Sequence, residues 1–228
     1  LALLSTGLFL SLYAESYPTT WLQDHVISLR AGEDIEVFAV PELLELDLSR
    51  IDWQGGTLRI SGCILEGQFG TIASVQLPLT VDSGQTLYLD QVTIQSAETA
   101  IEILDGGVFM SDVVLATTAK GVLLQDPVAS LEMINTHVAL ASVGVDVQAA
   151  ASVIISDCTF LTNDLGLKQA SGSSVSIENT LFQANETALV IEANSAIPGF
   201  SGHVDFCDSR TVLIDNKSTN PMNLDGVF

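Results

Sequence analysis

The sequence predicts an all-β fold, a right-handed single-stranded parallel β-helix of about eight coils. Three observations lead to this fold class. Apolar-x-apolar pairs recur every 21 to 23 residues, each repeat holds three short segments in which apolar and polar residues alternate, and the apolar residues are mainly aliphatic. Three alternating strands in a repeat of this length are typical of a coil with three flat sides, and stacked coils of this kind form a solenoid.

The first strand of each repeat is an apolar pair separated by one residue. The pairs are Leu87/Leu89, Val108/Met110, Leu131/Met133, Val153/Ile155 and Val175/Ile177. Two residues after these pairs stand, in order, Gln91, Asp112, Asn135, Asp157 and Asn179. Asn and Asp tolerate left-handed torsions and bond to neighbouring backbone groups. We therefore predict the first bend of every coil at these positions.

Two further strands complete each repeat. The second strands are expected at residues 92–94, 113–115, 136–138, 158–160 and 180–182, and the third strands contain Ile101/Ile103, Val122/Leu124, Val145/Val147, Leu167/Gln169 and Leu189/Ile191. The residue shortly before each third strand is Gly or Ala. Stacking at about 4.8 Å per coil predicts three parallel sheets and continuous inward ladders of aliphatic side chains.

The repeat continues toward both ends and suggests four parts of the chain. Leu58/Ile60 begins one coil earlier, and Val204/Phe206, followed by Asp208, predicts one coil later. The parts are an apolar N-terminal arm at residues 1–18, an N-terminal cap with the first coils at 19–54, the β-helix coils at 55–210 and a C-terminal cap or tail at 211–228.

The N-terminal arm begins with fourteen residues without charge, LALLSTGLFLSLYA. This stretch is too short for a helix that spans a bilayer, which needs about 20 apolar residues, so no membrane span is expected. It resembles the apolar core of a secretory signal, and the arm is either a retained segment or a signal remnant. A retained arm would cap the first coil or insert into a neighbouring subunit.

Charge and cysteine content exclude several functions. The net charge is −21 with seven Lys and Arg, so nucleic acids and anionic membranes would be repelled. No cofactor is expected, although Ca²⁺ attracted by the acidic surface stays open. Cys63 and Cys158 occupy one ladder about four coils apart, roughly 19 Å, and a disulfide needs Cα atoms within about 7 Å. We predict that both are reduced core residues.

Two segments carry a resemblance to known families. Ser-Asp-Cys-Thr-Phe at 156–160 and Ile-Glu-Asn-Thr-Leu-Phe at 177–182 are followed by Asn163 and Asn185. They resemble repeats of the pectate-lyase-like right-handed β-helix superfamily, over about residues 55–210. FLTN at 160–163 and FQAN at 182–185 are also similar to the FxxN repeats of autotransported surface adhesins. The superfamily implies either enzymes that cleave acidic polysaccharides or non-catalytic members, which have the same fold.

The sequence lacks the motifs of the superfamily's enzymes. The NTD, DD, GHG and RIK motifs of polygalacturonase-like enzymes do not occur, and Gly-His-Val-Asp at 202–205 is interpreted as part of a strand. Glu102 and Asp146 should lie two coils apart, about 9.6 Å, near the upper limit of roughly 9.5 Å for inverting glycosidases. Leu123 should lie between them. We therefore predict no catalytic residue, with Glu102, Glu132 and Asp146 as the alternative catalytic set.

Outward positions of the coils predict an interaction surface. On the first strand these positions hold Arg59, Tyr88, Phe109, Glu132, Ile154 and Ser176. The predicted surface combines the arm with outward apolar residues: Leu1, Leu3, Leu4, Leu8, Phe9, Leu10, Phe109, Leu123, Ile154, Leu181 and Val190. Apolar residues grouped over adjacent coils favour a partner.

These features favour a non-catalytic extracellular or cell-surface protein, either an adhesin module or the subunit of a self-assembling filament. Its partners would be further copies of itself, another surface protein or a glycan. The alternative function is a carbohydrate-binding or polysaccharide-degrading enzyme of the lyase or glycosidase class. Asn185-Glu-Thr187 and Asn216-Lys-Ser218 match the pattern of N-glycosylation sites.

Overall fold

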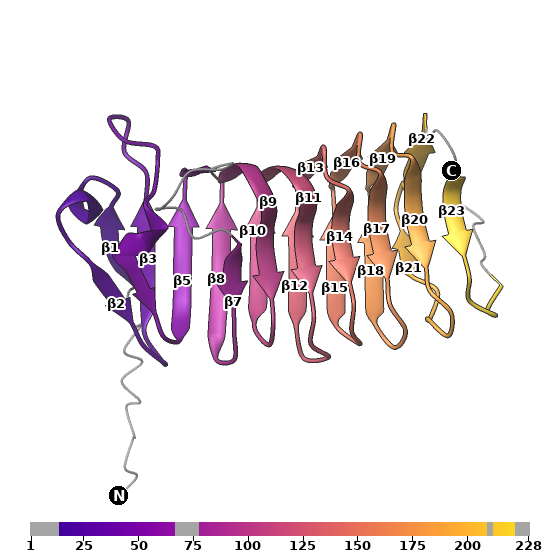
Figure 1. Ribbon diagram of the computed structural model, residues 1–228, viewed down its shortest axis with the longest axis horizontal. Helices are drawn as coiled ribbons and strands as arrows, with labels where there is room; N and C mark the ends of the chain where they lie inside the picture. Colours follow the sequence, from indigo (N-terminus) through magenta and orange to yellow (C-terminus); the bar gives the residue numbers. More distant parts are fainter. Residues whose placement is uncertain (1–13, 67–77, 209–211, 222–228) are drawn as a thin grey trace, which may run out of the picture.

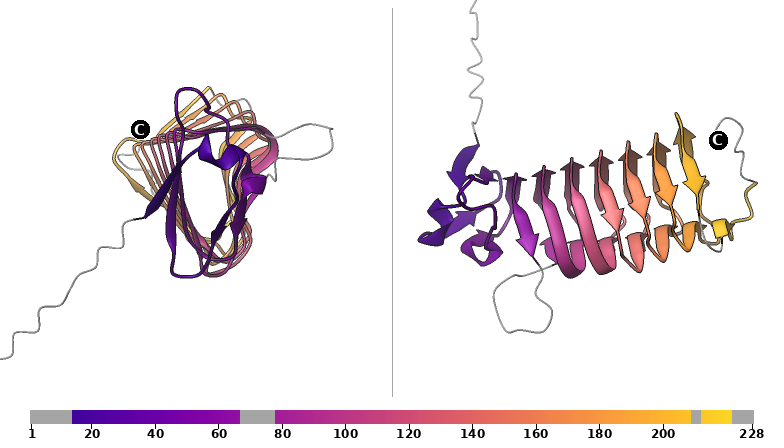
Figure 2. Two further views of the ribbon diagram at one scale, coloured as in Figure 1. Left: turned by 90° about the vertical axis from the view of Figure 1, so that its left-hand side faces the viewer. Right: turned by 90° about the horizontal axis from the view of Figure 1, so that it is seen from above.

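The structure is a computed structural model that describes residues 14–66, 78–208 and 212–221. It is an elongated stack of coils with residue 14 near one end and the last described residues at the other (Figure 1). Seen along the stack, the coils superimpose (Figure 2). Apart from the short 3-10 turns η1 (Trp21–Gln23) and η2 (Leu48–Arg50), the described elements are strands, and none of them is a helix long and apolar enough to cross a bilayer.

The first strands of the coils form one parallel sheet. Within the described residues it has nine strands, in the order β1 (Glu15–Pro18), β3 (Asp34–Phe38), β5 (Gly56–Ser61), β8 (Gln85–Asp90), β10 (Gly107–Ser111), β12 (Ser130–Ile134), β15 (Ser152–Ser156), β18 (Ser174–Glu178) and β21 (Gly199–Ser201). We call it the first sheet. The all-β solenoid of about eight coils predicted from the repeat is confirmed.

The second and third strands share a second sheet instead of forming two. The second strands are β6 (Ile64–Glu66), β13 (His137–Ala139), β16 (Thr159–Leu161), β19 (Leu181–Gln183) and β22 (Asp205–Cys207), and the third strands are β7 (Leu79–Val81), β14 (Val143–Val147), β17 (Leu165–Gln169), β20 (Thr187–Ile191) and β23 (Val212–Asn216). β9 (Thr93–Ile103) and β11 (Val114–Leu124) run through both sides of their coils and join the two sets. β2 (Ile27–Leu29) and β4 (Ile51–Trp53) form a separate pair near the N-terminal end.

The predicted vertical register is confirmed at the centre of the stack. Leu131 pairs with Val153, and Val153 pairs with Val175 in the next coil. These side chains and their neighbours in the ladder are buried. Burial of apolar surface stabilises a fold by roughly 25 cal/mol per Å², so each stacked coil extends one continuous aliphatic core.

The first bend of the coil has the backbone conformation that its residues predict. The φ angle is positive at each predicted position: Gln91 (53°), Asp112 (55°), Asn135 (47°), Asp157 (54°) and Asn179 (44°). A second bend also carries positive φ angles, at Leu140 (65°), Thr162 (55°) and Ala184 (55°). Residue type gives no signal for this second set, because none of the three residues favours the left-handed region.

The last coil differs from the prediction. Its first strand is β21, and Phe200 pairs with Ile177 there. Phe206 instead pairs with Phe182 in the second sheet, so Val204/Phe206 lies one side of the coil later than predicted. The bend at Gly202 (φ 64°) precedes this strand. Val204/Phe206 followed by Asp208 copies the pattern of a first strand and its bend, which, together with the insertion around Pro198, concealed the true bend in the sequence.

Close packing explains the small residue at the second position of the third strands β14, β17 and β20. A Cβ atom built on Gly144 would lie 2.5 Å from the carbonyl oxygen of Gly166 and 3.0 Å from the Phe160 ring. Phe160 is itself stacked on Phe182, with ring centroids 4.8 Å apart. The glycines at 144 and 166, which lie above each other in adjacent coils, therefore leave space for a ladder of aromatic rings inside the solenoid.

Two buried asparagines form a polar ladder beside these rings. The Asn163 side-chain oxygen accepts a hydrogen bond from the Ala141 N–H (3.0 Å), and its Nδ2 donates to the carbonyl of Val138 (3.1 Å) and to Oδ1 of Asn185 (3.0 Å). Asn185 in turn donates to the carbonyl of Phe160 (2.9 Å). Because Asn185 is fully buried and bonded inside the fold, it is not accessible to glycosylation in the folded chain.

The cysteines behave as the ladder predicts. Cys63 and Cys158 are buried and free. Burial raises the pKa of the Cys63 thiol to about 12 and the pKa of the Cys158 thiol to about 11. Both side chains therefore act as small apolar core residues.

Candidate functional site

A hollow of about 270 Å³ lies on the outer face of the first sheet. Its central column contains five outward side chains, one from each of β3, β5, β8, β10 and β12: Glu36, Arg59, Tyr88, Phe109 and Glu132. The alternation of each strand places these residues outward, and the coil register aligns them along the solenoid axis. We call this feature the aromatic hollow.

The aromatic side chains of the hollow are stacked in a fixed arrangement. The Tyr88 and Phe109 ring centroids are 4.7 Å apart and the ring planes differ by 8°. The Arg59 guanidinium carbon lies 4.1 Å from the Tyr88 ring centroid on the neighbouring coil, in a cation–π contact. The coil spacing of about 4.8 Å matches these stacking distances, so the fold itself holds the rings in place.

Arg59 is anchored by a carboxylate. Its Nε donates to Asp34 Oδ1 (3.0 Å) and its Nη2 donates to Asp34 Oδ2 (3.1 Å), which is a two-point ion pair. This hydrogen bonding raises the pKa of Arg59 above its usual value, so the guanidinium stays charged. Because the guanidinium is already paired with the Asp34 carboxylate, it positions the Tyr88 ring and attracts an incoming anion only weakly.

The rest of the hollow is acidic. Glu36, Asp90 and Glu132 line it, and Arg59 is the one cation among its lining residues. Hydroxyl groups run beside the aromatic column at matching strand positions. One column of the register holds, in order, Thr57, Thr86, Gly107, Ser130, Ser152 and Ser174, so the row of hydroxyl groups is interrupted at Gly107 on the coil of Phe109. The surface therefore combines aromatic edges, acids and hydroxyl groups, which suits a polar ligand without negative charge.

The three carboxylates of the alternative catalytic set do not converge. Glu132 lies on β12 of the first sheet, whereas Glu102 and Asp146 lie on β9 and β14 of the second sheet. Leu123 pairs with both Glu102 and Asp146 and separates them, as the spacing predicts. No group of three or more His, Cys, Asp or Glu residues that could hold a metal ion occurs in the part of the chain that the structure describes.

Asp146 is instead a buried carboxylate held between two partly exposed lysines. Its side chain lies 2.7 Å from Lys120 Nζ and 3.9 Å from Lys168 Nζ, and Gln148 Nε2 donates to it at 2.8 Å. Asp146 is only 3% exposed. Two lysines from the neighbouring coils therefore compensate its charge, which favours a structural role for this carboxylate.

The predicted apolar interaction surface is only partly exposed. Ile154 is 44% exposed, and Phe109 and Leu181 are half-buried. Leu123 and Val190 are each 9% exposed, which corrects the expectation that both present apolar surface. They share a column with the long side chain of Lys168, and packing along that column covers them. The predicted arm residues Leu1, Leu3, Leu4, Leu8, Phe9 and Leu10 lie outside the described residues.

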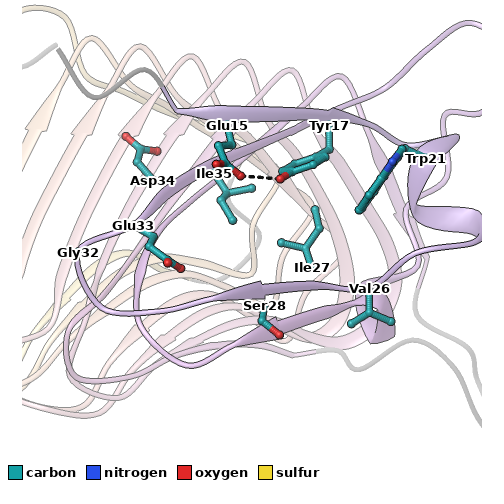
Figure 3. A pocket seen from close by; sticks show the side chains of 10 residues that line it. All are labelled: Glu15, Tyr17, Trp21, Val26, Ile27, Ser28, Gly32, Glu33, Asp34 and Ile35. Atoms are coloured by element: carbon teal, nitrogen blue, oxygen red, sulfur yellow. Dashed lines mark hydrogen bonds between the residues drawn. The ribbon is translucent and has the colours of Figure 1, made fainter. Parts of the chain in front are cut away.

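A second hollow, of about 320 Å³, lies at the N-terminal end of the solenoid. Figure 3 shows the side chains of Tyr17, Trp21, Ile27 and Ile35 around this opening between β1 and β2. The Tyr17 hydroxyl donates to the Glu15 carboxylate at 2.6 Å. This hydrogen bond raises the pKa of Tyr17 above its usual value. We call this feature the N-terminal mouth.

The sequence predicted four of the five side chains in the column of the aromatic hollow, without Glu36, and it did not predict the site that they form. Arg59, Tyr88, Phe109 and Glu132 were all predicted to point outward on consecutive first strands, which was the available signal. Their stacking depends on side-chain rotamers and on the Asp34 anchor, and periodicity carries no information about either.

The comparisons with known proteins agree with this architecture. A protein family described as a right-handed beta helix region matches residues 79–223, more than half of the chain. The searches against curated proteins and against solved structures found no match. The predicted resemblance to the pectate-lyase-like parallel β-helix superfamily is thus supported by a family match and by the coil architecture together. The chain belongs to the right-handed β-helix family.

Proposed function

We propose that this chain is a non-catalytic β-helix of the cell surface or extracellular space that acts as an adhesin module, with the aromatic hollow as its contact site for carbohydrate. The stacked Arg59, Tyr88 and Phe109 side chains are the observation that carries this proposal. Aromatic side chains supply apolar contact area at fixed positions, and sugar rings offer both C–H surfaces and hydroxyl groups.

The dimensions of the hollow suit an elongated glycan. Its central column crosses five strands from Glu36 to Glu132, and four coil spacings amount to about 19 Å. A chain of several sugar rings laid along the solenoid axis would meet the edges of both aromatic rings. The hydroxyl groups of Thr57, Thr86 and Ser130 would then face sugar hydroxyl groups on either side of Gly107.

Charge narrows the ligand to glycans without acidic groups. Three carboxylates line the hollow, and the guanidinium among them is already bonded to Asp34. The whole chain also carries a net charge of −21. Uronate, sulfate or phosphate groups would be repelled at this surface, whereas neutral or amine-bearing sugars would not.

The positions of the carboxylates support a non-catalytic role. Glu36 and Glu132, at opposite ends of the hollow, are four coils or about 19 Å apart, well beyond the roughly 6.5–9.5 Å of an inverting pair. Asp146 is neutralised by Lys120 and Lys168. Asp90 lies two coils from each of these glutamates and two residues further along its strand, roughly 12 Å away, so no two carboxylates of the hollow have the spacing of an inverting pair.

Binding measurements on a set of oligosaccharides would test this function. We expect binding to neutral or amine-bearing glycans such as cello- or chitosan-oligosaccharides, and none to polygalacturonate or alginate. Phe109→Ala should weaken binding about two- to tenfold, because the lost aromatic contact is worth about 0.5–1.5 kcal/mol and 1.4 kcal/mol is tenfold. Leu161→Ala is the matched control, since Leu161 is an exposed apolar residue on β16 of the other sheet.

Three outcomes would contradict the proposal. One is preferential binding of acidic polysaccharides, and another is binding that Phe109→Ala leaves unchanged. The third is the release of reducing sugar ends during incubation, which would revive the polysaccharide-degrading alternative. Lost activity in Glu132→Gln would then assign that carboxylate to catalysis.

Self-association is a second candidate function, and one observation favours it. Ile134 and Ile154 are 41% and 44% exposed on the adjacent strands β12 and β15, beside the aromatic hollow. Exposed apolar side chains that lie together favour contact with a partner, which here would be a second copy or another surface protein. Light scattering of the purified chain would test it. A monomer at all concentrations would rule out the filament.

A further inference from the structure

In the described chain, the ring pair of the aromatic hollow has a cation on only one of its two sides. The Arg59 guanidinium carbon lies 4.1 Å from the Tyr88 ring centroid, and the Asp34 carboxylate on the preceding coil holds it there. Phe109 stacks on the other side of Tyr88, because β8 lies between β5 and β10. The next residue of the column beyond Phe109 is Glu132. The order along the solenoid axis is therefore a carboxylate, a cation, two rings and a second carboxylate.

The second carboxylate has no cation of its own. Glu132 is half-buried, and its side chain has neither an ion pair nor a hydrogen bond among the residues that the structure describes. Its neighbour on the next coil is Ile154, and Ser130 and Ile134 flank it two positions away on β12. None of these side chains is charged. A partly buried carboxylate attracts a cation more strongly than an exposed one does, because water screens its charge less.

The opposite wall of the hollow suits a ligand that also bears hydroxyl groups. Two positions beyond the aromatic column, β5, β8 and β10 carry Ser61, Asp90 and Ser111. The Asp90 carboxylate accepts hydrogen bonds, and the Ser111 hydroxyl, which donates to Asp112 at 3.0 Å, can still accept one. A basic peptide would bring an ammonium to Glu132 but no row of hydroxyl groups to this wall. An amino sugar brings both, which favours a glycan over a peptide.

We propose that the ligand of the aromatic hollow is a glycan built of amino sugars, with a protonated amine held between the Phe109 ring and the Glu132 carboxylate. This inference rests on the proposed function and names the class of sugar within it. The ammonium takes the place at Phe109 that the Arg59 guanidinium takes at Tyr88. Both the face of an aromatic ring and a carboxylate attract a cation, so the two residues act together. An N-acetylated sugar keeps the ring and the hydroxyl groups but has no charge to place there.

Calorimetric titration with three tetrasaccharides separates the amine from the rest of the ligand. The probes are the glucosamine tetramer with free amines, its fully N-acetylated form and cellotetraose, at low ionic strength and at a pH where the amines are protonated. We expect all three to bind. The free-amine tetramer should bind about tenfold more tightly than the acetylated one, because a cation–π contact and a partly exposed ion pair act together. Added salt should reduce this preference.

Two variants of matched charge locate the preference. Glu132→Gln should lower it severalfold, whereas Glu178→Gln should leave it nearly unchanged, because Glu178 is an exposed acid on β18 of the same sheet and does not line the hollow. Both variants remove one negative charge, so a loose attraction of the polyamine to the net charge of −21 would weaken equally in both. Phe109→Leu should also lower the preference, since it removes the ring and keeps an apolar side chain.

Three results would overturn the inference. Equal affinity for the free-amine and acetylated tetramers, with binding still weakened by Phe109→Ala, would remove the amino-sugar class and leave the glycan function in place. An equal loss of preference in Glu132→Gln and Glu178→Gln would assign it to the net charge of the chain. Tighter binding of a lysine tetrapeptide than of the amino sugar would assign the hollow to basic peptides. If none of the three glycans binds, the proposed function fails together with the inference.

Discussion

The buried asparagine ladder gives the sharpest test of how the coils hold together. Asn163 is 2% exposed, and its side chain bonds to the Ala141 N–H, the Val138 carbonyl and Asn185 Oδ1. Asn163→Ala removes all three hydrogen bonds. The Asn185 oxygen keeps the backbone N–H of residue 163 as a donor, but the buried groups of Ala141 and Val138 lose their side-chain partner.

The magnitude follows from the Ala141 N–H, because the Val138 carbonyl remains in the parallel ladder between β13 and β16. A buried donor left without a partner costs about 1–3 kcal/mol, so Asn163→Ala should lower the free energy of unfolding by about 1–3 kcal/mol. Asp164→Ala is the control, because Asp164 is the exposed neighbour in the sequence and a surface change of this kind costs within about 0.5 kcal/mol.

Urea unfolding followed by circular dichroism and by tryptophan fluorescence would measure both free energies. Coincident transitions by the two probes would establish that one cooperative step is being compared. A loss smaller than about 1 kcal/mol in Asn163→Ala would refute the reasoning, because one unpaired buried N–H costs at least about 1 kcal/mol.

Two further predictions concern the core. Gly144→Ala places a Cβ atom 2.5 Å from the carbonyl oxygen of Gly166, so it should lower the free energy of unfolding in urea by about 1–3 kcal/mol. Gly107→Ala should lower it less, because the nearest atom to its Cβ is the Ser130 hydroxyl oxygen at 3.1 Å, on a side chain that can rotate. Equal losses in the two variants would contradict the close-packing argument. Burial raises the pKa of Cys63 to about 12 and of Cys158 to about 11, so the unfolded chain loses these protons first as pH rises. The stability that the two buried thiols contribute should be complete below about pH 9 and should be lost between about pH 9 and pH 11–12. A thiol reagent should react with both cysteines only when the chain unfolds, and rapid reaction of both in the folded protein would contradict their burial.

Periodicity was sufficient for the coil architecture. A repeat of about 22 residues makes Leu131, Val153 and Val175 vertical neighbours, and their pairing follows from backbone hydrogen bonds between identical positions of adjacent coils. The bends at Asn135 and Asp157 were predictable for a related reason, since the required left-handed conformation restricts residue type.

Prediction of bends from residue type failed at positions whose residues do not favour a positive φ angle. Leu140 and Thr162 adopt positive φ angles that no propensity favours. Prediction of the last coil failed for another reason: Gly202 readily adopts its positive φ angle, but Val204/Phe206 followed by Asp208 copies the pattern of a first strand and its bend, so the strand of Phe206 was assigned to the wrong side.

The candidate site, like the fold, could be predicted from the sequence only in part. The sequence alone determined which side chains point outward and in what order, because alternation along a strand and repetition between coils are one-dimensional patterns. Only the tertiary structure decided that Tyr88 and Phe109 stack into a hollow, that Lys120 reaches Asp146, and that Leu123 is covered. These contacts depend on the rotamers and reach of side chains on neighbouring coils, and such lateral packing leaves no periodic trace in the sequence.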